Sequence, residues 1–237
     1  MKRNKVRTEI SCFDKLCDGG LNESSINLIV GGAGSGKTIF SIQFLMAGLK
    51  KGETCVYITF EEKKEELYQN MLCLGFDLQK YEDKGTFIFM EYSPEKVKNL
   101  LDEGGGALDQ IMRFKHVSRI AIDSITSFAL LFENELRKKK ASLELFDILK
   151  KWNITCVLTL QKGLEEKDLV ATTNNGPLEF EVDTIILLYL LRSDKKRKRY
   201  LEILKMRGSK HSEGFHEIRV DKGIVIFPTE LKIKKDN

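Results

Sequence analysis

Eight consecutive residues near the start of the chain have the types and spacing that bind phosphate groups. They are Gly31, Gly32, Ala33, Gly34, Ser35, Gly36, Lys37 and Thr38, which match the P-loop pattern GxxxxGK(S/T). In this pattern, glycines let backbone N–H groups turn toward phosphate oxygens, the lysine reaches the β and γ phosphates, and the threonine hydroxyl binds Mg²⁺. The alternative is a merely glycine-rich turn, but an apolar segment precedes the motif and a helical pattern follows it. The sequence therefore predicts phosphate binding.

Three acidic residues follow predicted strands and would complete such a site. Asp123 follows the apolar residues 120–122, where a carboxylate holds the water shell of Mg²⁺ with support from Ser124. The alternative is that Asp123 only caps the next helix. Glu61 and Glu62 follow the first strand after the P-loop helix, where a hydrolase needs a carboxylate to polarise the attacking water. The alternative is that both only favour the N-terminus of the following helix through its dipole.

The elements that would position these residues alternate along the chain. Short runs that are apolar at nearly every residue are typical of strands buried on both faces of a parallel sheet. They lie at residues 26–30, 55–60, 86–90, 119–122, 155–160 and 184–190, and helical patterns lie between them at 37–50, 62–74, 94–114 and 141–152. This alternation predicts an α/β fold with a mostly parallel central sheet flanked by helices.

The end of the chain has a different pattern. A basic run precedes the strand-like segment 200–206, and the segments 217–220 and 224–227 flank the turn sequence Asp-Lys-Gly. Such short gaps favour C-terminal antiparallel hairpins that extend the parallel core. No repeat or linker divides the chain, and its 237 residues fit one α/β domain.

Composition excludes several classes of protein. No apolar run reaches the ~18 residues needed to span a bilayer, and the basic N-terminus is not followed by the apolar stretch of a signal peptide. Five cysteines, an odd number without a CxxC pair, favour reduced buried thiols and a cytoplasmic location. The three histidines lack zinc-ligand spacing, and no GxSxG nucleophile elbow is present.

The formal net charge of +4 comes from one segment. Residues 195–199 are five consecutive lysines and arginines, and without these five charges the net charge of +4 becomes −1. The body of the protein is therefore near neutral, which argues against a uniformly basic surface for nucleic acid or membrane. The basic run is expected at a hairpin tip beside a subunit interface or a partner.

Together, these motifs resemble the KaiC-type ATPases of the RecA superfamily, which include the cyanobacterial clock ATPase and many archaeal single-domain proteins. The resemblance is carried by the P-loop, TFEE at 59–62, IAIDS at 120–124, KMRGSKH at 205–211 and DKGIVIFP at 221–228, and it extends upstream to Thr8, Phe13-Asp14-Lys15-Leu16 and Gly19-Gly20. It implies one RecA-like domain over residues 1–237, ATP and Mg²⁺ as cofactors, and ATP bound between the subunits of a homo-oligomeric ring, usually a hexamer.

The resemblance also assigns roles to individual residues. Glu61 and Glu62 match the paired catalytic glutamates. Lys205, Arg207 and His211 match the segment that reaches the ATP phosphates of the adjacent subunit, where cations neutralise charge on the transferring phosphoryl group. From the residues alone, Lys205 and Arg207 would be exposed residues of an edge strand.

Other matches to the family are partial. Gln161 stands at a strand end where RecA-type proteins often place a γ-phosphate sensor, and an ordinary polar strand end is the alternative. The polar segment 162–176 is expected to be a mobile loop that faces the ring centre. Only one P-loop is present, whereas the clock protein carries two such domains, and its phosphorylated Ser/Thr pair has no secure match here. Autophosphorylation and clock function are therefore not carried over.

Three functions follow from this sequence. The leading hypothesis is a regulatory ATPase whose active sites lie between subunits of a ring. The second is a recombinase-related DNA-binding protein in which residues 195–199 and 137–140 contact phosphates; it is favoured less because neither run contains an interleaved aromatic residue. The third is a slow nucleotide-dependent switch for a protein partner, which the sequence does not separate from the first.

Overall fold

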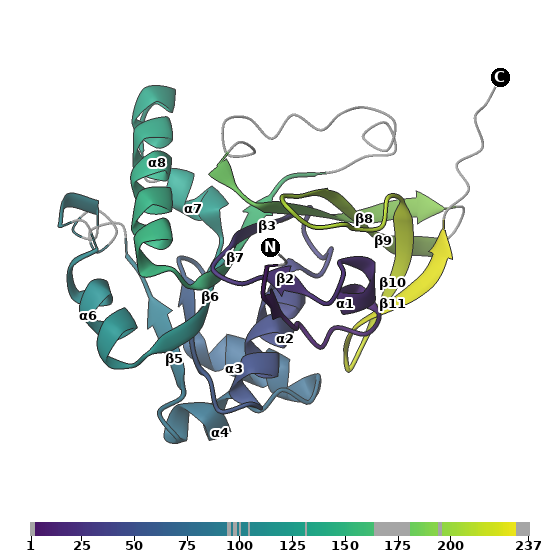
Figure 1. The fold of residues 1–237 in the computed structure, drawn as a ribbon, viewed down its shortest axis with the longest axis horizontal. Coiled ribbons are helices and arrows are strands. Elements are labelled where there is room, and N and C mark those ends of the chain that lie inside the picture. Colours follow the sequence, from purple (N-terminus) through teal and green to yellow (C-terminus); the bar gives the residue numbers. More distant parts are fainter. Residues whose placement is uncertain are drawn as a thin grey trace.

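Strands and helices alternate along most of the chain (Figure 1). The computed structural model describes residues 3–93, 96, 99, 101–103, 105–130, 132–163, 181–193 and 196–230. In chain order the elements are β1 (Lys5–Val6), α1 (Phe13–Leu16), β2 (Leu21–Asn22), β3 (Ile26–Gly31), α2 (Lys37–Leu49), β4 (Thr54–Thr59), α3 (Lys64–Cys73), α4 (Leu78–Asp83), β5 (Phe87–Glu91), α6 (Gly106–Phe114), β6 (Val117–Asp123), α7 (Ile125–Leu130), α8 (Glu135–Trp152), β7 (Thr155–Gln161), β8 (Thr184–Ser193), β9 (Lys196–Met206), β10 (Phe215–Asp221) and β11 (Gly223–Glu230).

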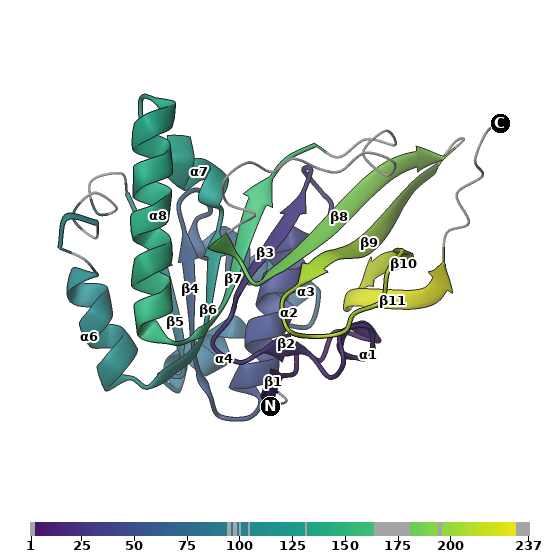
Figure 2. The same ribbon diagram turned by 45° about the horizontal axis from the view of Figure 1, so that its top comes forward.

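A nine-stranded sheet with the order β11-β10-β9-β8-β3-β7-β6-β4-β5 organises the described residues. From β8 to β5, every neighbouring pair of strands is parallel. The strands β9, β10 and β11 then add in antiparallel fashion. Figure 2 shows β8 and β9 as a long hairpin that extends away from the helices. The predicted mostly parallel core with C-terminal antiparallel hairpins is confirmed.

Two hydrophobic cores, one on each face of the sheet, explain why the strands are apolar at nearly every position. In β3, the side chain of Ile29 joins a cluster with α2, α3 and α4, whereas Leu28 and Val30 join a cluster with α6, α7 and α8. All three side chains are 0% exposed. Because successive strand residues point to opposite faces, both faces must be apolar when both are covered.

Two predicted helices differ from the structure at their boundaries. The helix expected at 141–152 begins six residues earlier as α8, because the Asn134 side chain caps it by accepting a hydrogen bond from the Arg137 N–H at 2.9 Å. Apart from the exposed Leu136, residues 136–140 are charged, so no apolar pattern marked these turns. Of the helix expected at 94–114, α6 supplies the second half, and residues 94, 95, 97, 98, 100 and 104 lie outside the described residues.

All five cysteines are free. Cys17, Cys55 and Cys156 are buried, as predicted, whereas Cys12 is half-buried and Cys73 is exposed. Within the described residues, none of the helices combines the length and the apolar character needed to cross a bilayer.

We distinguish two edges of the sheet: the carboxyl edge, where the parallel strands end, and the amino edge, where they begin. At the carboxyl edge, β3, β4, β6 and β7 end side by side: Gly31 pairs with Gln161, and Thr59 pairs with Asp123. At the amino edge, β3 begins at Ile26 and the antiparallel strand β9 ends at Met206. Ligands of such sheets bind beyond the carboxyl ends of the strands.

Candidate functional site

The P-loop residues 31–38 connect β3 to α2 at the carboxyl edge. Gly34 and Gly36 have φ angles of 71° and 111°, a backbone region that glycine adopts without a steric penalty. The Lys37 ammonium donates to the Gly32 carbonyl at 2.9 Å, so the side chain lies across the loop. Burial lowers the pKa of Lys37, and the charge of Asp123 partly offsets this effect. The Ser35 hydroxyl is buried without a hydrogen-bond partner among the described residues.

Asp123 receives hydrogen bonds from three different elements. Its Oδ2 accepts from the Thr38 hydroxyl at 2.6 Å and from the Tyr57 hydroxyl at 3.0 Å, and its Oδ1 accepts from the Thr159 hydroxyl at 2.5 Å. Burial, followed by the charges of Asp123 and Glu62, raises the pKa of Tyr57 well above its usual value, which keeps this hydroxyl a donor. Asp123 is thus held in the sheet, and α7 is capped by the next residue, Ser124, whose Oγ accepts from the Ser127 N–H at 3.4 Å.

Glu61 and Glu62 leave the end of β4 in a turn held by Thr59. The Thr59 hydroxyl accepts hydrogen bonds from the N–H groups of both glutamates, at 3.3 and 3.0 Å. Helix α3 begins only at Lys64, so the glutamates precede its first turn. Burial raises the pKa of Glu62, as do the charges of Asp123 and Glu66. The Glu62 carboxylate therefore lies near enough to Asp123 for the two negative charges to repel each other.

Helix α7 contacts both Glu61 and the end of β7. The Ser127 hydroxyl donates a short hydrogen bond to Glu61 Oε1, and the Ser124 and Ser127 hydroxyl oxygens are 3.1 Å apart. The hydroxyl of Thr126, the residue before Ser127, accepts a hydrogen bond from the Gln161 N–H at 2.7 Å. One helical turn thereby fixes a predicted catalytic carboxylate and the predicted γ-phosphate sensor relative to each other.

These residues surround a cavity of about 400 Å³ at the carboxyl edge. Its lining consists of Ala33, Gly34, Lys37, Thr38, Thr59, Glu61, Glu62, Glu66, Asp123, Ser124 and Gln161. The cavity therefore combines phosphate-binding and acidic groups, as a site for a nucleoside triphosphate and its cation requires.

The Thr38 hydroxyl and the Asp123 carboxylate form an adjacent pair of hard oxygen ligands, which fits Mg²⁺. In the part of the chain that the structure describes, no cluster of three His, Cys, Asp or Glu side chains would hold a metal ion by itself. Mg²⁺ usually keeps water and binds substrate phosphates as well, so such a cluster is not required here.

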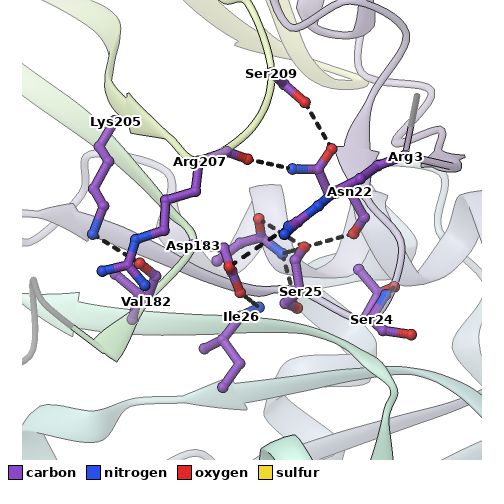
Figure 3. Close-up of polar contacts among 12 residues, drawn as sticks. Arg3, Asn22, Ser24, Ser25, Ile26, Val182, Asp183, Lys205, Arg207 and Ser209 are labelled. Carbon is purple, nitrogen blue, oxygen red and sulfur yellow. Dashed lines mark hydrogen bonds and ion pairs between the residues drawn. The ribbon is translucent and has the colours of Figure 1, made fainter. Parts of the chain in front are cut away.

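Lys205 and Arg207 lie at the amino edge, beside Val182 and Asp183 (Figure 3). The Lys205 ammonium donates to the Val182 carbonyl at 2.9 Å, and the Arg207 N–H donates to the Asp183 carbonyl at 2.8 Å. Asp183 Oδ2 in turn accepts from the N–H of Ile26, the first residue of β3. With six residues in β3, the two edges are about 17 Å apart at ~3.3 Å per residue.

A β-bulge immediately precedes this pair of cations. Ile185 pairs with Lys205 whereas Ile186 pairs with Ile203, so Leu204 is the extra residue of β9. Bulges change the direction of the side chains that follow them. His211, at the end of the same segment, has a buried Nδ1 without a hydrogen-bond partner among the described residues. None of Lys205, Arg207 and His211 lines the cavity of its own chain.

The basic run lies at the other end of β9, and residues 194 and 195 fall outside the described residues. Arg199 pairs with Leu190, and its Nε donates to the Gly34 carbonyl in the P-loop at 3.0 Å. The Lys198 ammonium forms an ion pair with the Glu217 carboxylate at 3.4 Å. The run therefore begins β9 beside the P-loop of its own chain and is separated from Lys205 by the length of the strand. Most of the predicted loop at 162–176 also lies outside the described residues.

Sequence reasoning missed several residues that shape the site. Tyr57 and Thr159 are polar positions inside otherwise apolar strand runs, and this interruption was the available signal. Ser127 was not considered, and the Ser124 hydroxyl, which was expected to support Asp123, contacts Ser127 instead; the spacing of three residues, which brings side chains together in a helical turn, was the available signal. Arg199 was considered only as one charge in a run. Its contact with Gly34 depends on how β8 and β9 pair, which the sequence does not show.

Comparison with known proteins points to one family. The family described as "ATPase: KaiC" matches residues 6–231. The chain is 34% identical to the circadian clock protein KaiC3 of Synechocystis, over 94% of this chain and 46% of that protein. It is also 34% identical to a UPF0273 protein of Pyrococcus horikoshii, over 96% of this chain and 95% of that protein. The chain thus spans about half of the clock protein but nearly all of the archaeal one.

A solved structure agrees with these matches. The crystal structure of a KaiC-like protein from the hyperthermophilic archaeon Pyrococcus horikoshii is similar with a TM-score of 0.84 and 32% sequence identity. The similarity covers 95% of this chain and all of that chain.

Proposed function

This chain belongs to the KaiC family of ATPases within the RecA superfamily, and we propose that it is a Mg²⁺-dependent ATPase with active sites between the subunits of a homo-oligomeric ring. The observation that carries the proposal is the division of its charged residues between the two edges of the sheet. The carboxyl edge offers phosphate and metal ligands together with carboxylates, and the amino edge offers cations that the same chain cannot bring to its own P-loop.

In this proposal the P-loop binds the triphosphate of ATP. The backbone N–H groups of residues 31–38 contact the phosphate oxygens. The Lys37 ammonium exchanges its hydrogen bond to the Gly32 carbonyl for one to a phosphate oxygen. Thr38 and Asp123 would hold Mg²⁺, which would neutralise charge on the phosphates. Tyr57 and Thr159 keep the Asp123 carboxylate fixed, so little reorganisation is needed when the substrate binds.

Hydrolysis requires a water molecule in line with the bond between the γ phosphate and ADP. Glu61, held by Ser127, and Glu62, beside Asp123, orient this water and take its proton as its oxygen bonds to the γ phosphorus. The bond to ADP breaks and inorganic phosphate forms. Gln161 lies at the end of the neighbouring strand β7, where it contacts the γ phosphate in this proposal.

The remaining charge on the phosphoryl group is neutralised by an adjacent subunit in this proposal. Lys205 and Arg207 are about 17 Å from their own P-loop by strand register, which exceeds the reach of either side chain. The acidic mouth formed by Glu61, Glu62 and Glu66 attracts such a cationic segment from a second copy. A ring, with a hexamer as the expected size, gives every site one such neighbour.

The test compares Arg207→Ala with Lys37→Ala. We expect Arg207→Ala to lower ATP turnover by about 10³-fold and to bind ATP with a Kd within about twofold of wild type. Lys37→Ala should lose both binding and turnover. Phosphate release, equilibrium ATP binding and gel filtration with ADP or an ATP analogue measure the three properties. Normal hydrolysis by Arg207→Ala would remove the proposed role of the amino edge.

A nucleotide-dependent switch for a protein partner is compatible with the same site. The relatives named as clock proteins are about twice as long as this chain, so their biological role is not transferred. Different ring sizes with ADP and with ATP would support a switch. For nucleic-acid binding the structure offers less support, since Arg199 and Lys198 contact Gly34 and Glu217 of their own chain.

A further inference from the structure

The segment 205–211, which carries the cations of the amino edge, rests on residues from the opposite end of the chain. We call residues 3–25, with β1, α1 and β2, the amino-terminal bracket. β1 and β2 form a separate two-stranded antiparallel sheet. The bracket contains the upstream motifs noted in the sequence, Thr8, Phe13-Asp14-Lys15-Leu16 and Gly19-Gly20, to which the hydrolysis mechanism gives no role.

Asn22 bridges the turn of the 205–211 segment (Figure 3). Its Nδ2 donates to the Arg207 carbonyl at 2.9 Å, and its Oδ1 accepts from the Ser209 hydroxyl at 2.8 Å. Asn22 is 0% exposed, so no water replaces these bonds, and a lost partner leaves a buried polar group unsatisfied. One side-chain amide therefore fixes both sides of Gly208, whose φ of 69° makes the turn.

Lys5 reinforces the same turn from β1. Its ammonium donates to the Ser209 hydroxyl at 2.8 Å and to the carbonyls of Cys17 and Gly20 at 3.0 and 3.2 Å. The ammonium group has three protons to donate, and these bonds tie the 205–211 segment to two points of the bracket. Lys5 thus links the segment to the loop between α1 and β2.

The bracket itself is internally constrained. Asp14 Oδ1 accepts from the N–H and the hydroxyl of Thr8 at 3.0 and 2.8 Å, and its Oδ2 accepts from the Glu9 N–H at 3.2 Å. Gly20 has a φ of 129°, and a Cβ there would lie 2.3 Å from the Val6 carbonyl oxygen. Only glycine permits this approach. The upstream motifs therefore stabilise the conformation that presents Asn22 and Lys5.

The regular pairing of β9 ends just before Arg207. The last pair of the β8–β9 ladder joins Met206 to Thr184, and beyond it the Arg207 N–H still bonds the Asp183 carbonyl at 2.8 Å. Asp183 is also 4.0 Å from Arg3 of the bracket. The backbone of Arg207 therefore depends on Asp183 on one side and on Asn22 on the other.

We propose that the amino-terminal bracket is the positioning device for the Arg207 segment, with Asn22 as the principal positioning residue for hydrolysis in the adjacent subunit. This inference rests on the proposed interface ATPase. Asn22 acts through the backbone of Arg207 and does not touch the nucleotide. Since a misplacement of about 1 Å reduces catalysis by roughly 10²-fold, loss of the amide bridge lowers turnover at the neighbour's site and leaves ATP binding by the same chain intact.

Mixed rings test this inference. The chain Glu61→Gln/Glu62→Gln keeps its amino edge but has no working carboxylates, and Arg207→Ala has working carboxylates but lacks the arginine of its amino edge. Each alone should be inactive, and subunits mixed before ATP is added should recover turnover. Asn22→Ala in the Glu61→Gln/Glu62→Gln chain should reduce the recovered turnover at least about tenfold. In the Arg207→Ala chain it should change turnover by less than about twofold.

The outcomes separate the inference from its premise. A mixture without recovered turnover overturns the interface ATPase and, with it, the role of the bracket. Recovered turnover that Asn22→Ala lowers equally in both chains, or in neither, overturns the bracket's role alone. Ser209→Ala removes one partner of the amide on a less buried residue, so it repeats the comparison if Asn22→Ala folds poorly. Asn4→Ala, which removes a surface bond to Glu23 in the same bracket, should have no effect in either chain.

Discussion

The two edges of the sheet hold their charged residues by different means. At the carboxyl edge, Asp123 is fixed by side chains from α2, β4 and β7, all of which belong to the central α/β unit. At the amino edge, Arg207 is fixed through its backbone by Asp183 and by Asn22, which belongs to a segment 185 residues away in sequence. The proposed ATP site is thus built into the sheet. The arginine that we propose acts on a neighbour depends on a separate support, so the two can be perturbed separately.

Arg119 connects the amino-terminal bracket to α2, the helix that follows the P-loop, and its loss should have the largest effect on stability. It is 1% exposed, forms two hydrogen bonds with Glu53 at 2.6 and 3.0 Å, and donates to the carbonyls of Arg7 in the bracket and Phe44 in the P-loop helix. Arg119→Ala should lower the free energy of unfolding by about 3 kcal/mol, because it leaves a carboxylate and two carbonyls without their donor. Urea denaturation with and without ATP measures this loss.

A matched arginine provides the control for this prediction. Arg113 is 73% exposed and lies 4.0 Å from Asp109, so Arg113→Ala should change the free energy of unfolding by less than about 0.5 kcal/mol. If Arg119→Ala unfolds at the same urea concentration as wild type, the bracket and the P-loop helix do not depend on this side chain, and the two regions are held independently.

Ser127 should affect only the carboxyl edge. Ser127→Ala removes the donor to Glu61, and we expect kcat to fall about tenfold with the Kd for ATP unchanged. In a Glu61→Gln background, Ser127→Ala should add no further loss, because both changes act on the same group. Single-turnover kinetics measure both quantities.

Ser142→Ala removes another buried helical hydroxyl, which bonds the Lys138 carbonyl at 2.8 Å, and should leave kcat unchanged. A full additional tenfold loss from Ser127→Ala in the Glu61→Gln background would show that Ser127 acts by another route.

Substitution of Arg199 should produce the smallest change, an increase in the Kd for ATP. It tests whether this end of β9 serves the same chain, unlike the end that carries Lys205. Its bond to the Gly34 carbonyl supports the P-loop, so Arg199→Ala should raise the Kd for ATP about fivefold in the same chain. Arg197→Ala removes an equal charge from an exposed neighbour in the same run and should have little effect. Calorimetric titration with an ATP analogue distinguishes the two variants; equal losses would indicate a general charge effect instead of a specific contact.

Much of this arrangement was predictable because it depends on local sequence. The strands of the parallel core are apolar on both faces, the P-loop occupies eight consecutive positions, and the carboxylates follow strands that end at the same edge. The bracket was not predicted as an element, because β1 and β2 have two residues each and α1 has four. Asn22 gave no signal, since its partners Arg207 and Ser209 are brought to it only by tertiary structure. The same holds for the buried role of Arg119, which the sequence shows only as one strand residue.

The single strand β9 also sets a fixed length between two successive active sites of the proposed ring. Arg199 touches the P-loop of its own subunit, whereas Lys205 is offered to the next one, and both are paired with β8 along the same ladder. Since a paired strand does not stretch, neither contact can be adjusted by lengthening the chain between them. In such a ring, the spacing between these two contacts of each subunit would therefore be set by the length of β9.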